Sequence, residues 1–302
     1  MSTADSSAAR RRIGIAFVAI SALSFGAMAI FARFAYAAGT DTTTLLALRF
    51  TLAAGVMATL AWWKGARWPR GSALAAVVAM GAIGYGGQAF SFFTALTKAP
   101  AGLVALLLYL HPALVAVLSA LVLSERLDAR RIAALACALT GMLLTVLPTL
   151  APDAAARYPD IGVGVAFGIA AAVIYAVYIV VGARIGARVA PLPMATIVIG
   201  SAAVLFATAA AVQGPRWPAT ATGWLAVGAI ALICTVMAIS LFFAGLARVG
   251  PTQASTLSTI EPLFTVLLAA LLLGETVTLA QVAGGALILG AVFMLARPGR
   301  RG

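Results

Sequence analysis

Apolar runs of about twenty residues fill most of the chain, and this feature constrains the fold more than any other. A helix needs about 20 residues to cross the hydrocarbon core of a bilayer. Ten runs of this length lie between proline, glycine and charge clusters. They cover residues 13–35, 43–63, 72–93, 101–122, 130–148, 162–184, 191–212, 222–246, 252–273 and 278–296. The sequence therefore predicts an all-α integral membrane protein with ten transmembrane helices.

The composition agrees with lipid as the main solvent. Of 302 residues, 63% are hydrophobic and only 9% are charged, which leaves too few polar side chains to coat a water-soluble domain of this size. The formal charge of +12 is gathered in short clusters between apolar runs. This pattern is typical of membrane topology signals and not of a nucleic-acid-binding surface, so no nucleic-acid partner is expected.

Basic residues predict the orientation, because cytoplasmic loops keep Lys and Arg. With the N-terminus inside, fifteen fall on the cytoplasmic side: Arg10, Arg11, Arg12, Lys64, Arg67, Arg70, Arg126, Arg130, Arg131, Arg184, Arg188, Arg248, Arg297, Arg300 and Arg301. Three fall on the other side, namely Lys98, Arg157 and Arg216. We therefore expect both termini in the cytoplasm. The first apolar run is longer than a signal-peptide core, so we expect it to remain as a helix.

An internal repeat divides the chain into two halves. A shift of 150 residues pairs Phe92-Phe93 with Phe242-Phe243, Pro112 with Pro262, Glu125 with Glu275 and Pro148 with Pro298; chance matching is the alternative explanation. The repeat predicts a cytoplasmic tail (1–12), a five-helix unit (13–148), an extracytoplasmic linker (149–161), a second five-helix unit (162–297) and a second tail (298–302). Since five is odd, the two units have opposite orientations, which is the geometric basis of alternating access.

Prolines at matching positions point to the centre of the protein. Pro112 and Pro262 fall near the middle of the fourth and ninth runs, where each removes a backbone donor. Interrupted helices at matching depths indicate a transporter binding site, so both prolines are candidates for helix breaks and gating. The preceding residues, His111 and Glu261, are ionisable at bilayer depth and are candidates to line a cavity. A neutral core imidazole and a structural hydrogen bond are the alternatives.

Further polar and aromatic residues are candidates for the same cavity. Arg49 lies deep in the second run and is a candidate to bind an anionic group, whereas Arg33 is expected to extend to the outer interface. The other candidates are Tyr85, Gln88, Tyr109, Tyr175, Tyr178, Gln253 and Ser258. Contacts between neighbouring helices are the alternative explanation for many of them.

Two glutamates and one capping motif have expected structural roles. Glu125 and Glu275 occupy matched positions at the ends of the two units, where they are expected to close the turns into the fifth and tenth helices. Thr278 and Gln281 have the spacing of a capping box.

Residue sets for catalysis or metal binding are not apparent. The sequence shows no Ser-His-Asp set, no Cys/His ligand spacing and no carboxylate pair placed for hydrolysis. Cys137 and Cys234 lie in apolar runs and are expected to pack there. We therefore expect no enzyme activity, no cofactor and no metal.

The motifs resemble those of the drug/metabolite transporter superfamily, in particular its EamA-type branch. The resemblance rests on Leu48-Arg49-Phe50 and on the two unit ends, Pro112 to Glu125 with Leu-Ser-Glu and Pro262 to Glu275 with Leu-Gly-Glu. It covers residues 13–297 and implies ten helices around a central cavity, with no ATPase subunit. Within the superfamily the chain looks most like bacterial exporters of aromatic and other amino acids.

The leading functional prediction is export of amino acids or related metabolites across a bacterial plasma membrane. Arg49 would receive a carboxylate and Glu261 an ammonium, with Tyr and Phe as a stacking wall; Glu261 is also a candidate carrier of a coupling proton. Drugs, nucleosides or sugar derivatives are alternative cargoes, and a membrane-embedded lipid-modifying enzyme is a distant alternative. The expected partners are a small-molecule substrate and membrane lipid, and a monomer is compatible with the sequence.

Overall fold

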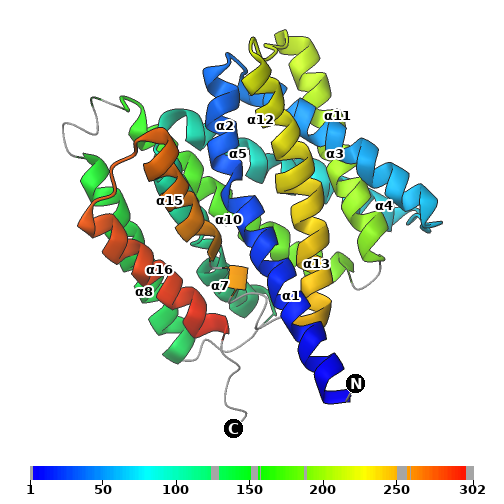
Figure 1. Cartoon of the computed structure of the whole chain (residues 1–302), viewed down its shortest axis with the longest axis horizontal. Coiled ribbons are helices and arrows are strands. Elements are labelled where there is room, and N and C mark those ends of the chain that lie inside the picture. Colours follow the sequence, from blue (N-terminus) through cyan, green and yellow to red (C-terminus); the bar gives the residue numbers. More distant parts are fainter. Residues whose placement is uncertain are drawn as a thin grey trace.

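The protein is a bundle of helices, shown in Figure 1. The structure, a computed structural model, describes residues 3–123, 129–150, 156, 158–186, 189–249, 257–258 and 260–296. No strand occurs within these ranges. Residues 151–155 and 157 of the predicted linker, together with Gln253 and Glu125, lie outside them.

The helices of the first unit follow the predicted apolar runs. They are α1 (Thr3–Gly26), α2 (Met28–Ala37), α3 (Thr42–Trp63), α4 (Ser72–Ala79), η1 (Met80–Tyr85), α5 (Gly86–Lys98), α6 (Ala101–Leu108), α7 (His111–Leu123), α8 (Ala129–Val146) and η2 (Leu147–Leu150).

The helices of the second unit do the same. They are α10 (Ile161–Gly186), α11 (Pro191–Gln213), α12 (Ala221–Ala231), η3 (Leu232–Met237), α13 (Ala238–Val249), α15 (Ile260–Leu273) and α16 (Leu279–Ala296). In the described part of the chain, six helical stretches are long and apolar enough to cross a membrane, and four shorter apolar helices accompany them. The number of ten crossings stays a prediction.

The first backbone amides of two helices are capped by nearby side chains. The side chain of Asp41 accepts a hydrogen bond from the Thr44 amide at 2.9 Å and so caps α3. At the start of α16, the Gln281 amide donates to the Thr278 hydroxyl at 3.2 Å and the Thr278 amide donates to Gln281 Oε1 at 3.0 Å. These reciprocal bonds confirm the predicted capping box.

The most extensive helix pairings join the two halves of the chain. They are α8 with α16, α3 with α11, α1 with α13 and α5 with α10; Figure 1 shows α8 beside α16 and α1 beside α13. Exchange of the halves converts the α1–α13 pair into the α10–α5 pair. The arrangement therefore fits two similar units that pack on each other.

Two glycines show this symmetry at the level of single residues. A Cβ on Gly14 of α1 would lie 2.7 Å from Val249 Cγ1, and a Cβ on Gly164 of α10 would lie 2.7 Å from Ala99 Cβ. Gly164 and Val249 follow Gly14 and Ala99, respectively, by 150 residues. The same close contact thus occurs once in each half, as expected for small residues that let membrane helices approach.

A π-helical turn interrupts one helix in each half. η1 lies between α4 and α5, and η3 lies between α12 and α13. Tyr85 in η1 and Thr235 in η3 occupy equivalent positions, 150 residues apart. Such bulges are rare and frequently lie at functional sites.

We predict that Gly164→Val destabilises the protein by about 1–3 kcal/mol, because the added side chain overpacks the contact with Ala99. Thermal unfolding in detergent measures the effect. Gly162→Val is the matched control, since a Cβ there meets no described residue within 4 Å. The β-branched side chain is the same in both variants. Equal melting temperatures for the two variants would contradict the close-contact interpretation.

Candidate functional site

Pro112 coincides with a break between two short helices. α6 ends at Leu108 and α7 begins at His111, and a proline at position 112 has no N–H to offer the Leu108 carbonyl. His111 Nδ1 lies 2.9 Å from this carbonyl oxygen. Because a carbonyl only accepts, Nδ1 is the donor, and the His111 ring satisfies the group that the proline leaves unbonded.

Pro262 has the same effect in the second half. It has no N–H for the carbonyl of Ser258, and this oxygen accepts a hydrogen bond from the Tyr109 hydroxyl at 2.8 Å. The same hydroxyl lies 3.0 Å from Glu261 Oε2. Tyr109, at the end of α6, therefore connects the break in the first half with the start of α15 in the second.

The two contacts of the Tyr109 hydroxyl, with the Ser258 carbonyl and with Glu261, share a single proton. A phenol carries one proton, so Tyr109 can donate to only one of its two oxygen neighbours. When Tyr109 donates to Ser258, the contact with Glu261 needs a proton on the Glu261 carboxyl. A protonated Glu261 satisfies both contacts at once.

Aromatic rings extend from this point in a continuous row. His111 lies 4.7 Å from Tyr175 between ring centroids, Tyr175 stacks on Tyr178 at 6.1 Å, and Tyr178 lies 5.8 Å from Tyr85. Tyr109 is at the other end, 5.7 Å from His111. We call these five residues the aromatic row. It brings together side chains from η1, α10 and the α6–α7 break.

Arg49 lies beyond the Tyr85 end of the row. Its side chain donates from Nε to Thr235 Oγ1 at 3.0 Å and from Nη2 to Tyr85 Oη at 3.2 Å. The guanidinium also lies 4.9 Å from the Phe50 ring and 5.2 Å from the Phe93 ring. Only 3% of Arg49 is exposed, so this cation is held inside the protein by one residue from each π-helical turn.

The remaining candidates are placed as follows. Gln88 is buried in α5, one turn after Tyr85. Arg33 is bonded to protein groups at one end of the bundle, as is Glu275. In the described ranges, no group of three or more His, Cys, Asp or Glu residues could hold a metal ion.

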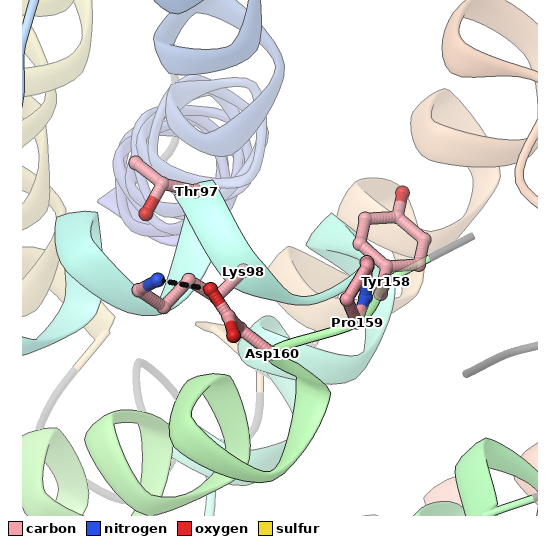
Figure 2. A pocket seen from close by; sticks show the side chains of 5 residues that line it. All are labelled: Thr97, Lys98, Tyr158, Pro159 and Asp160. Atoms are coloured by element: carbon pink, nitrogen blue, oxygen red, sulfur yellow. Dashed lines mark hydrogen bonds and ion pairs between the residues drawn. The ribbon is translucent and has the colours of Figure 1, made fainter. Parts of the chain in front are cut away.

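Two surface cavities lie away from the centre of the aromatic row. One, of about 230 Å³, is lined by Thr97, Lys98, Tyr158, Pro159 and Asp160 and is shown in Figure 2. The other, of about 410 Å³, is formed mainly by apolar and small residues of η1, α5 and α11. Phe206 lines the second cavity and stacks on Phe50 at 5.7 Å.

Thr235, Phe50 and Phe93 belong to the surroundings of Arg49 although their types do not suggest a site. The sequence does offer a signal for Thr235, because this residue follows the candidate Tyr85 by the 150 residues of the internal repeat. The two phenylalanines are not distinguishable by type from core residues.

A model of the EamA-like transporter family matches residues 12–147 and again residues 162–297. The chain belongs to the EamA-like transporter family. An uncharacterized transporter of Archaeoglobus fulgidus is 28% identical to this EamA-like protein over 208 residues, which are 68% of the chain and 70% of that relative. A crystal structure, described only as that of a protein, superposes with a TM-score of 0.64 at 27% sequence identity. The superposition covers 95% of this chain and 96% of the chain in that structure. The protein is thus a multi-pass membrane protein of a transporter family.

We predict that Thr235→Val destabilises this EamA-like protein by about 2 kcal/mol, because a buried guanidinium loses an acceptor. The melting temperature in detergent measures the change. Thr94→Val is the matched control, since the buried Thr94 hydroxyl has no hydrogen-bond partner among the described residues and its loss should be close to neutral. Similar melting of both variants would argue against a contribution from the Arg49–Thr235 bond.

Proposed function

We propose that this chain is a secondary transporter that exports amino acids, aromatic and other neutral ones included, or related small metabolites across a bacterial plasma membrane. Transport occurs by alternating access of a site between Arg49 and Glu261. The predicted ten helices in two inverted units, with both termini in the cytoplasm, provide the two related conformations that this mechanism needs.

The observation that carries the proposal is the placement of two ionisable groups of opposite type, Arg49 and Glu261. The ion pairs in the described part of the chain involve other residues, and neither Arg49 nor Glu261 takes part in one. Ionised groups at bilayer depth are costly unless they have a partner. A zwitterion supplies both partners, since its carboxylate suits Arg49 and its ammonium suits Glu261.

The surroundings of the two charges support the same cargo. The aromatic row runs from Tyr85, which binds Arg49, to Tyr109, which contacts Glu261. Tyrosine faces stabilise aromatic side chains by stacking and ammonium groups by cation–π attraction.

A second group of cargoes is favoured by the enclosure of Arg49. Its guanidinium is covered by Phe50 and Phe93 and already donates to Tyr85 and Thr235. If it stays enclosed during transport, the site offers aromatic faces and Glu261 only. Such a site suits drugs, nucleosides or sugar derivatives without a carboxylate.

A coupling proton is a second role for Glu261. The contacts of Tyr109 are fully satisfied only when the Glu261 carboxyl is protonated. Release of this proton would free the carboxylate for an ammonium group. Export would then depend on the pH gradient.

Counterflow in liposomes tests the cargo. Purified protein is reconstituted with internal phenylalanine, and uptake of labelled phenylalanine is compared with that of a labelled nucleoside and a lipophilic amine. Exchange of phenylalanine supports the proposal, whereas exchange of the other compounds alone favours the second group of cargoes. Failure of every amino acid tested to exchange would contradict the proposed function.

Glu261→Gln separates the roles of this residue. The amide keeps a donor for Tyr109 but can neither ionise nor pair with an ammonium, so we expect at least a tenfold loss of phenylalanine flux, about the value of one charge-assisted hydrogen bond. Loss at every pH indicates ammonium binding, and loss of the dependence on a pH gradient alone indicates proton coupling. Asp160→Asn is the control, because it neutralises an exposed carboxylate outside the aromatic row. Unchanged flux in Glu261→Gln would remove this residue from the proposed site.

A further inference from the structure

Glu275 makes an unusual contact between the two halves. It follows α15, yet its carboxylate accepts hydrogen bonds from the amides of Ala101 at 2.7 Å and Gly102 at 3.1 Å, 174 and 173 residues away. These are the first two amides of α6, which have no partner within their own helix. A carboxylate at this end is also favoured by the helix dipole. The second half of the chain therefore caps a helix of the first.

Arg33 holds this carboxylate in place. Its Nη2 lies 3.8 Å from Glu275 Oε1 and donates to the Tyr158 hydroxyl at 2.6 Å, while Nη1 donates to the Leu96 carbonyl at 2.7 Å. The side chain of Glu275 is 6% exposed and that of Arg33 is 21% exposed. The network of Arg33, Glu275, Tyr158 and the start of α6 thus joins α2, α5, α6 and the residues before α10 and α16. We call it the Glu275 network.

The helix that Glu275 caps is the one that carries part of the candidate site. α6 has only eight residues, Ala101–Leu108, and spans about 12 Å. Tyr109 and His111 follow directly at its other end. Because a helix this short moves as one rigid piece, a shift at its start is transmitted to Tyr109 and hence to the contact with Glu261.

We propose that Glu275 is a positioning residue for the cargo site. Its carboxylate fixes the start of α6 and thereby sets the contact between Tyr109 and Glu261, and its release opens this end of the bundle, the predicted extracytoplasmic end. The proposal rests on the proposed function only in treating the aromatic row as the cargo site. The opening of the Glu275 network is a property of the fold and can be measured without a cargo.

The same end of the molecule offers a matched control. Lys98 and Asp160 form an ion pair of 2.6 Å beside the cavity in Figure 2, with side chains that are 31% and 61% exposed. Such exposed pairs contribute little to stability. Loss of this pair by Lys98→Gln should leave the Glu275 network closed.

The first test measures access to the capped end of α6. Ala101→Cys is introduced into protein in which Cys137 and Cys234 are replaced by alanine, and its reaction with a membrane-impermeant maleimide is timed. Ala101 is fully buried, so labelling should be slow. Glu275→Gln should accelerate it about tenfold or more, since a charge-assisted cap is lost, and Lys98→Gln should not.

Arg33→Gln provides a second route to the same result if Glu275→Gln does not fold. It removes the cation that holds the carboxylate and leaves the capping group in place, so labelling should again accelerate. Unchanged labelling in whichever of the two variants folds would overturn the proposal.

The second test asks whether the two ends of α6 are coupled. Tyr109→Phe breaks the contact with Glu261 at the far end, and the labelling rate is measured for this variant, for Glu275→Gln and for both together. Changes at independent sites this far apart are additive in free energy. We expect the double variant to label little faster than Glu275→Gln alone, and additive effects would overturn the positioning role.

Counterflow then connects the network to transport. Glu275→Gln should raise the KM for labelled phenylalanine at least about fivefold, an ordinary size for coupling between sites, and Lys98→Gln should leave it unchanged. Absence of phenylalanine exchange in the unmodified protein would count against the proposed function alone. A KM in Glu275→Gln equal to that of the unmodified protein would count against the positioning role.

Discussion

The need to satisfy every backbone polar group without water governs this structure. In hydrocarbon an unpaired N–H or C=O costs several kcal/mol, so the described chain is helical and each helix break has to be compensated by a side chain. The carbonyls left by Pro112 and Pro262 accept from His111 and Tyr109, and the first amides of α6 donate to Glu275. His111 and Tyr109 are residues of the candidate site, and Glu275 lies at the other end of α6, the helix that leads to Tyr109. The groups that stabilise the two proline breaks are thus also candidate site residues.

The two halves share a framework but differ where chemistry is expected. The glycine contacts of α1 and α10 and the π-helical turns occur in both halves. His111 in the first half corresponds to Glu261 in the second, and Tyr85 corresponds to Thr235. Arg49 corresponds to Ile199, a fully buried apolar residue. A symmetric frame therefore encloses an asymmetric set of groups, which suits a cargo whose two ends carry different charges.

The positions of the helices and the capping box at Thr278 could be predicted because they depend on local sequence: length, apolar character and helix-start residues. The repeat also indicated His111 and Glu261. The π-helical turns could not be predicted, since a shift of one hydrogen bond has no characteristic residue type. Nor could the partner of Glu275 be predicted, because it lies 174 residues away and depends on how the halves pack. The order of the aromatic row is likewise a result of packing between helices.

The pairing of helices across the halves has a consequence for biogenesis. The main partners of α1, α3 and α8 are α13, α11 and α16, which all belong to the second half and leave the ribosome later. When the first half enters the bilayer, the faces that these helices will bury are still covered by lipid, and the capping carboxylate of α6 has not been synthesised. Final assembly is therefore post-insertional, and the half-made chain is the stage at which membrane quality control would meet exposed polar backbone.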